Sequence, residues 1–264
     1  MDQQEMRFDS ADVDAAQGVM GRIVPGKSTR VVALTDEQVL ILDGVETEQV
    51  VPLPWLDEQG DADRSLVGRV ALRSMLSQGL VKTLPTADGS DVTLEAIPEI
   101  TGPLVLRRTA QAIMSVERTT SLGKSWVFCY VHDGLGILEE DVADSGHHRF
   151  SVYSQDHLGE RLQGFLDPTS AAVLSGRTRT FGVGQFEAEA ASIPEVAEAQ
   201  VVTTLAVVRA EAEEIVNVSV FAGPQGVFVL RGSDRDGSGN ETLTLTEAGA
   251  ADLRALPGSL VAAP

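Results

Sequence analysis

The chain has 264 residues, 43% of them apolar and only 5% aromatic, which is enough to bury the core of one large or two modest globular domains. Its 20 Lys and Arg residues stand against 39 Asp and Glu residues, so the formal net charge at pH 7 is −19. Contact with phosphate groups needs cations, so this charge argues against binding to nucleic acid or to anionic lipid.

The N-terminal segment, residues 1–27, is acidic and only weakly periodic, and we expect a tail that is either frayed or a short surface helix. It lacks the basic start and the apolar run of a signal peptide. No stretch of the sequence approaches the roughly 20 consecutive apolar residues of a membrane span. We therefore expect a cytoplasmic protein without a membrane span.

The segment after this tail allows two interpretations. Alternation and β-branching in Arg30–Leu34 and Gln38–Leu42 predict a hairpin around a short turn. Thr35 followed by Gln38 is instead typical of the capping box that begins a helix. Short apolar runs do not decide between the two, so whether Thr35–Leu42 is helix or hairpin stays open.

The clearest helix is predicted over Asp61–Gly79, where the final glycine suits the left-handed position that ends a helix. Arg69 and Arg73, at i and i+4, share the face opposite the apolar residues of this helix, and we expect a solvated face there, with contact to an acidic partner as the alternative. A short strand pair and a second helix, Glu99–Met114, follow. The apolar stripe that we expect to face the core consists of Leu66, Val67, Val70, Ala71, Met75 and Leu76.

Two later stretches of the chain share one order of elements, namely strand, glycine-containing turn, strand, loop, strand and helix. They are Trp126–Phe165 and Asn217–Leu256, about 91 positions apart, and we expect them to superpose. The sequence therefore predicts an α+β fold of pseudo-twofold duplicated units, each an antiparallel sheet with flanking helices. We expect a single domain over residues 28–264, with halves of about 28–166 and 167–264.

The four histidines are the candidate metal ligands and catalytic bases. His147 and His148 are neighbours on a predicted strand and point to opposite faces, so the pair cannot easily hold one metal ion. His132 and His148 could converge, with Asp133 nearby, but solvated loop positions are the simpler expectation. We expect no transition metal at these three histidines or at His157.

Other patterns with chemical meaning are incomplete. The single cysteine, Cys129, excludes an internal disulfide and a thiolate metal cluster, and its alternation with apolar residues indicates a buried strand position. The acidic stretch Ser233–Glu241 lacks the spacing of a calcium-binding loop. No Gly-x-Ser-x-Gly, His-Glu-x-x-His or Cys-x-x-Cys motif is present. We therefore expect a protein that is not an enzyme and that uses no cofactor.

Several short phrases follow one another in a characteristic order. Leu34–Glu37 reads Leu-Thr-Asp-Glu, the proline-containing Val51–Pro54 comes next, and a long helix closes in Arg73–Leu80. The Ser-Gly-Arg phrase Ser175–Arg177 and the hairpin, strand and helix of Val218–Leu256 complete the series. This order resembles the EspG-type chaperones of actinobacterial type VII (ESX) secretion.

The resemblance implies a single α+β domain with pseudo-twofold halves, and a cytosolic protein-binding chaperone in place of an enzyme. Members of the family hold the apolar helical tip of PE–PPE secretion substrates until export. The physical requirement for such binding is an apolar surface rimmed by polar groups. The tips of the two glycine turns make Leu135, Phe221 and Val227 our candidate partner-binding residues.

The alternative from another class is a transcriptional regulator or ligand sensor built on a winged helix. Asp61–Gly79 would be its recognition helix and the following strand pair its wing. This helix offers only Arg64, Arg69 and Arg73 as cations, few for neutralising phosphates. The identity of the partner, the contact surface and the oligomeric state are left open by the sequence.

Overall fold

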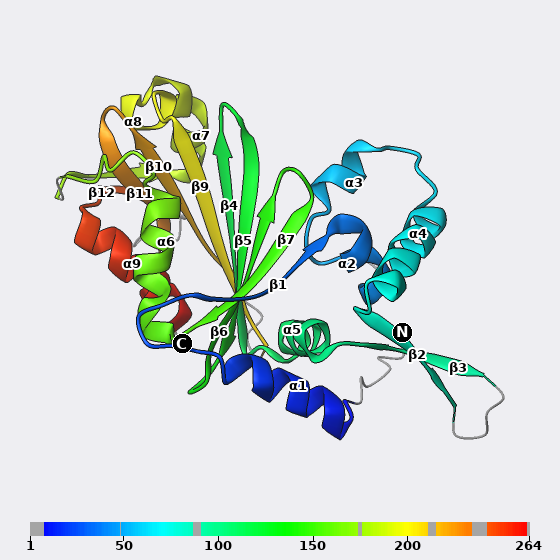
Figure 1. Ribbon diagram of the computed structural model, residues 1–264. Coiled ribbons are helices and arrows are strands. Elements are labelled where there is room, and N and C mark those ends of the chain that lie inside the picture. The colour runs from blue at the N-terminus through cyan, green and yellow to red at the C-terminus, as the bar shows by residue number, and fades with distance from the viewer. Residues whose placement is uncertain are drawn as a thin grey trace.

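The computed structural model describes residues 8–47, 49–86, 91–173, 176–210, 215–233 and 242–262. Within them, ten antiparallel strands form one sheet in the order β1-β7-β6-β5-β4-β9-β10-β11-β12-β8, and helices lie on both sides of it (Figure 1). A separate hairpin of β2 and β3 projects from one end. The chain is therefore an α+β protein, as predicted.

The strands are β1 (Thr29–Thr35), β2 (Val81–Pro85), β3 (Val92–Ala96), β4 (Ala112–Thr120), β5 (Gly123–His132), β6 (Gly136–Ala143), β7 (His147–Tyr153), β8 (Thr178–Gly182), β9 (Val201–Arg209), β10 (Val216–Gly223), β11 (Gly226–Ser233) and β12 (Thr242–Glu247). The α-helices are α1 (Ser10–Met20), α2 (Asp36–Asp43), α3 (Pro54–Glu58), α4 (Arg64–Ser77), α5 (Pro98–Thr109), α6 (Leu158–Leu166), α7 (Val183–Glu189), α8 (Pro194–Ala197) and α9 (Ala250–Ala262). Short 3₁₀ turns lie at Gln155–His157 and Ala190–Ser192.

The large sheet consists of two equivalent halves, which confirms the predicted duplication. Counted inward from the two ends, β1, β7, β6, β5 and β4 correspond to β8, β12, β11, β10 and β9. The central strands β4 and β9 pair with Ser115 opposite Ala206, 91 positions later in the chain. Each half then ends in a helix, and these helices, α6 and α9, pack on each other on one face of the sheet.

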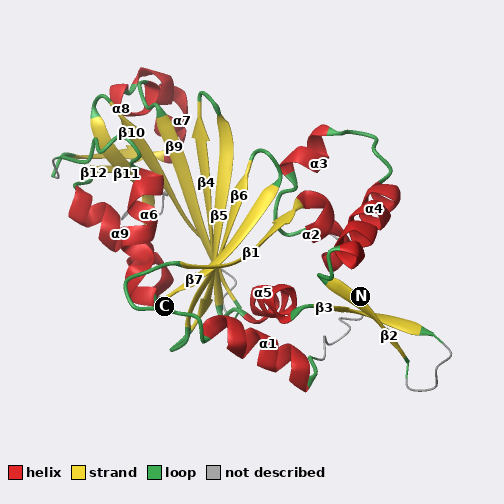
Figure 2. Cartoon of the chain, in the orientation of Figure 1, coloured by secondary structure: helices red, strands yellow, loops and turns green. Residues whose placement is uncertain are grey.

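The two faces of the sheet bury different clusters because alternate side chains of a strand point to opposite sides. Cys129 and Val131 of β5 face α6 and α9, whereas Phe128 and Tyr130 face the helices α1 and α5. Figure 2 shows these two groups of helices on opposite sides of the fan of strands. Cys129 is fully buried, as expected, and its burial raises the pKa of the thiol to about 12.

The two end strands of the sheet are both short or irregular. Strand β1 pairs with β7 in a register that shifts between Arg30 and Val32. Strand β8 has five residues and pairs only with β12 among the described strands.

The N-terminal tail expected over residues 1–27 contains a packed helix. Asp9 and Asp12 each accept a hydrogen bond from the backbone N–H of the other, which starts α1. The helix then lies on α5, where Gly102 allows close approach, since a Cβ atom there would lie 2.6 Å from the carbonyl oxygen of Ala15. Of the two alternatives the segment therefore contains a helix, and one side of this helix is buried, at Ala15, Ala16, Val19 and Met20.

Both interpretations of the next segment hold in part. The first apolar run is strand β1, but the second is helix α2 and not the return strand of a hairpin. The capping box is present, with the backbone N–H of Thr35 donating to Gln38 Oε1 at 3.0 Å. Val39 and Leu40 are fully buried, so the second apolar run contributes core residues from a helix.

Two helix predictions need correction. The helix expected to reach Met114 ends at Thr109, because Ala112–Thr120 is strand β4 at the centre of the sheet. The expected apolar stripe of α4 is also rotated. Its buried residues are Gly68, Ala71 and Met75, whereas Leu66, Val70 and Leu76 are exposed. The side of α4 that carries the small residues Gly68 and Ala71 faces inward, because α2 approaches α4 closely at Gly68.

A buried charge cluster ties the helices of the first half to the sheet. His148 Nε2 lies 2.9 Å from Asp36 Oδ1, and His148 Nδ1 lies 2.7 Å from Glu140 Oε1. Glu140 Oε2 accepts a hydrogen bond of 2.8 Å from Tyr130 and lies 3.2 Å from Arg107 Nε. Asp36 also accepts a bond from the backbone of α3, so the cluster joins α2, α3, α5, β6 and β7.

The expectation of solvated histidines is therefore wrong for two of the four. His148 is fully buried and His132 is 3% exposed, whereas the neighbouring His147 is exposed, as expected for opposite faces of a strand. Burial of His148 is possible because Asp36, 112 positions away, supplies one of its partners. Among the described residues, no group of three or more His, Cys, Asp or Glu side chains is arranged to hold a metal ion.

The pKa values in this cluster follow from burial and pairing. Burial alone would lower the pKa of His148, but its hydrogen bonds to Asp36 and Glu140 outweigh burial and raise it. Burial alone would raise the pKa of Glu140, but the charge of Arg107 and the bond to His148 hold it below its ordinary value. The folded state thus favours a charged His148 beside an ionised Glu140.

The crossing of α6 and α9 predicts a difference between two glycines of α6. A Cβ atom at Gly159 would overlap the carbonyl oxygen of Arg254, whereas one at Gly164 would meet nothing within 4 Å. We expect Gly159→Ala to lower the free energy of unfolding by about 1–3 kcal/mol. The matched control, Gly164→Ala, should raise it by about 0.5–1 kcal/mol, because alanine favours a helix. Urea denaturation of both variants measures the change in unfolding free energy. Equal changes in the two variants would contradict the close packing of α6 on α9 at Gly159.

The charge cluster predicts a stability that depends on pH. Because folding raises the pKa of His148, its contribution is complete below the ordinary value of 6.5 and is lost as the pH rises through the folded-state pKa. At pH 6 we expect His148→Gln to cost about 3–5 kcal/mol of unfolding free energy, since it leaves buried carboxylates unpaired. Denaturation of both proteins at pH 6 and pH 9.5 should show a smaller difference at the higher pH.

The exposed neighbour gives the control for this experiment. His147→Gln removes the same side chain from the same strand, and should leave stability within about 0.5 kcal/mol of the parent. A difference between wild type and His148→Gln that is constant or grows with pH would contradict the assignment of a charged His148.

Candidate functional site

The three predicted partner-binding residues lie in different surroundings. Leu135 is 64% exposed at the turn between β5 and β6, whereas Phe221 and Val227 are 8% and 1% exposed. The second turn is shorter by one residue, and α8 closes over it, with Gly223 in close contact with the backbone of Glu198. Of the three, only Leu135 presents a large surface, and contact of each with a partner stays a prediction.

Leu135 lies at the rim of a cavity of about 570 Å³, which we call the apolar groove. It runs between α1, α5 and the turn from β5 to β6. Its apolar lining includes Phe8, Val13, Met20, Val105, Leu106 and Leu135.

His132 is one of the polar residues that line the apolar groove, together with Gln17, Thr109 and Gln111. Its Nε2 atom is buried and has no hydrogen-bond partner among the described residues. Burial lowers the pKa of His132, so the ring is neutral at pH 7. A neutral, enclosed imidazole leaves the groove apolar in character.

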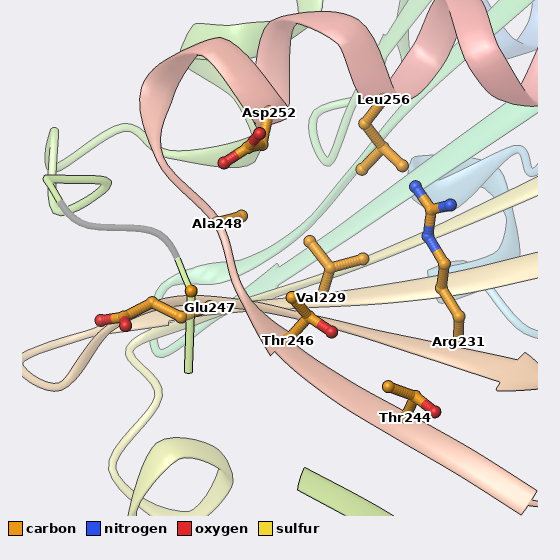
Figure 3. Close-up of a pocket in the computed structure, with 9 residues that line it drawn as sticks. Val229, Arg231, Thr244, Thr246, Glu247, Ala248, Asp252 and Leu256 are labelled. Carbon is orange, nitrogen blue, oxygen red and sulfur yellow. The ribbon is translucent and has the colours of Figure 1, made fainter. Parts of the chain in front are cut away.

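A second hollow, which we call the edge pocket, lies between α9 and the strands β11 and β12 (Figure 3). Its volume is about 440 Å³. Figure 3 shows Arg231 reaching from β11 toward α9, and the Glu247 side chain pointing away from the other lining residues. The buried floor of the pocket is apolar, with Val229 of β11, Ala248, and Leu256 projecting from α9 on the opposite side (Figure 3), and the more exposed rim is polar, with Arg231, Thr244, Thr246 and Asp252.

The edge pocket exists because the two halves of the protein differ at equivalent positions. In the first half, Glu139 of β6 pairs with Arg161 of α6, with 2.7 Å between Nη2 and Oε1. Glu139 is the fourth residue of β6, and Val229 is the fourth residue of β11. Arg161 lies three positions after the first buried leucine of α6, and Leu256 lies three positions after the first buried leucine of α9. Val229 and Leu256 are thus the equivalents of Glu139 and Arg161. Two shorter apolar side chains thus replace a long ion pair and leave space beneath α9. Comparison of the repeats in the sequence could have found this change.

One wall of the edge pocket is fixed by a further ion pair. Arg177 donates to Glu247 through Nη2 at 2.6 Å and through Nε at 2.8 Å, and also to the carbonyl of Gln225 at 3.0 Å. The hydrogen bond from Arg177 lowers the pKa of Glu247. Glu247 is therefore ionised and already paired with Arg177, whereas Arg231 has no ion-pair partner within the described part of the chain.

The chemistry of the two hollows suits the binding of a polypeptide. The edge pocket offers hydrogen-bond donors and acceptors around an apolar floor, and the apolar groove offers a larger area of aliphatic surface. No helix of the described residues is long and apolar enough to cross a membrane. The acidic stretch Ser233–Glu241, which lacks the spacing of a calcium-binding loop, lies outside the described residues except for its first position.

Comparison with known proteins gives one informative result. No protein-family model matches the sequence. No curated protein matches it either. The structure of the Mycobacterium tuberculosis type VII secretion system chaperone EspG5, in complex with the PE25–PPE41 dimer, is similar with a TM-score of 0.55 and 8% sequence identity. The similarity covers 89% of this chain and 96% of EspG5.

At this identity the similarity concerns the fold, and it extends over nearly the whole of both chains. The chain therefore has the fold of EspG5, a chaperone of the type VII secretion system, as the order of its sequence phrases implied.

Proposed function

We propose that this protein is a cytoplasmic chaperone, and not an enzyme, that binds a helical PE–PPE-type protein destined for type VII secretion. The observation that carries the proposal is the shared fold with EspG5, which was solved together with a PE25–PPE41 dimer. The net charge of −19 agrees with a protein partner better than with a nucleic acid. No observation favours the winged-helix regulator.

The edge pocket is the proposed contact surface. An apolar side chain from the tip of a partner helix would reach Val229 and Leu256 at its floor. Full burial of one such side chain contributes about 1.5–3 kcal/mol. At the rim, Arg231 would donate hydrogen bonds to the partner and Asp252 would accept them. These two opposite charges would select the orientation of the partner.

The three sequence-predicted residues enter the proposal in two roles. Leu135 would contact the partner directly from the apolar groove, since its side chain is exposed. Phe221 and Val227 would act from within the core, where they fix the hairpin of β10 and β11. Val227 lies two residues before Val229 on the same face of β11, so it supports the floor of the edge pocket.

Co-expression tests the function. We expect the protein to form a stable complex with a PE–PPE-type pair encoded in the same genome, seen as co-elution in size-exclusion chromatography. Thr246→Arg should fill the edge pocket and weaken the complex at least tenfold, which corresponds to about 1.4 kcal/mol or more. Isothermal titration calorimetry with purified components measures the change in affinity.

Separate variants distinguish the two hollows. Leu135→Asp tests the apolar groove, and Leu122→Asp is its control, because Leu122 is 93% exposed on another turn of the same sheet. We expect the control to bind like wild type. Failure to capture any helical PE–PPE-type pair would reject the chaperone function, whereas capture that is insensitive to Thr246→Arg would reject only the proposed surface.

A further inference from the structure

One side of α4 exposes apolar and cationic residues together. Leu66 is 52% exposed, Val70 61% and Leu76 36%. Arg69 and Arg73 are also exposed, and all five lie on one side of the helix at spacings of three and four residues. We call these five residues the α4 face. Such a patch of large exposed apolar side chains is typical of a surface that binds another protein.

The α4 face is positively charged, whereas the whole chain is negatively charged. The net charge is −19, yet no acidic residue occurs between Arg64 and Ser77. Arg64 pairs with Asp57 at 2.8 Å, whereas Arg69 and Arg73 have no ion-pair partner in the described parts of the chain. Like charges at i and i+4 repel each other on a helix, so this arrangement disfavours the isolated helix. Carboxylates of a partner would turn the repulsion into attraction.

The α4 face is also placed for a partner other than the one bound at the edge pocket. Helix α4 packs on α2 and lies away from the ten-stranded sheet, whereas α9 lies at the other side of the molecule (Figure 1). The adjoining hairpin of β2 and β3 adds exposed apolar residues, namely Leu84, Val92 and Leu94. A protein bound here would leave the edge pocket free.

The chemistry of the face selects one class of occupant. A symmetric dimer of this chain through α4 would set Arg69 and Arg73 near their own copies, which repel. An anionic membrane is disfavoured because two free arginines stand against a net charge of −19. We propose that the α4 face binds a helix of a second protein, one with an apolar stripe flanked by Asp and Glu residues.

In this complex the partner helix lies along α4 with its apolar stripe against Leu66 and Val70. Its carboxylates lie on the side of Arg69 and Arg73, where bidentate hydrogen bonds with the guanidinium groups are possible. The apolar residues supply affinity, and the arginines select an acidic partner over a basic one. The protein would thus hold two partners, one at each end.

The probe is a synthetic helical peptide with leucine at i, i+3, i+4 and i+7 and glutamate on both flanks. A twin peptide carries lysine in place of glutamate. Fluorescence anisotropy with the full chain should show at least tenfold tighter binding of the glutamate peptide. The affinity should fall about tenfold or more when the salt concentration rises from 50 to 500 mM.

Variants assign the binding to the α4 face. Arg69→Glu with Arg73→Glu, and separately Leu66→Ser with Val70→Ser, should each weaken binding at least tenfold. The matched control is Lys27→Glu with Arg30→Glu, which changes the net charge equally at two exposed cations whose side chains have no ion-pair partner among the described residues. Thr246→Arg should have no effect, which separates this site from the edge pocket. Equal binding of the two peptides, no binding of the glutamate peptide, or an equal loss in the control would overturn the proposal.

Discussion

The antiparallel pairing of β4 with β9 is the interaction on which the rest of the structure depends. Each half alone would be a five-stranded sheet, and this one ladder joins them into a continuous sheet of ten. Because Ser115 pairs with Ala206, the pseudo-twofold axis passes through this seam and brings α6 against α9. The seam therefore fixes the position of α9, and with it the space above β11 and β12 that forms the edge pocket.

The two halves share a backbone but use it for different purposes. The first half carries its charges inside, where Glu140 and His148 tie α2 and α3 to the sheet. At the equivalent places the second half has Leu230 and Leu243, and it has no counterpart of the pair Glu139–Arg161. The first half therefore closes the space beneath its helix α6 with an ion pair, whereas the second half leaves the edge pocket open beneath α9.

The sequence predicted the parts of this fold that depend on local pattern. The duplicated units follow from period-2 alternation and glycine turns, and the start of α2 follows from the capping box at Thr35. The parts that it missed depend on distant contacts. The orientation of α4 is set by the approach of α2 to Gly68, and the burial of His148 by Asp36. The exposure of Leu135 could be predicted because it lies in a local turn, whereas the edge pocket depends on how α9 lies over the sheet.

The irregular end strands have a consequence for a protein whose proposed task is to hold apolar segments. A long, regular sheet edge offers unpaired backbone groups to any neighbouring chain and invites aggregation. Here β1 carries a register shift between Arg30 and Val32, and β8 is only five residues long. Both features shorten the continuous ladder that a foreign strand could extend. The molecule can thus present apolar hollows while the ends of its sheet resist growth by self-association.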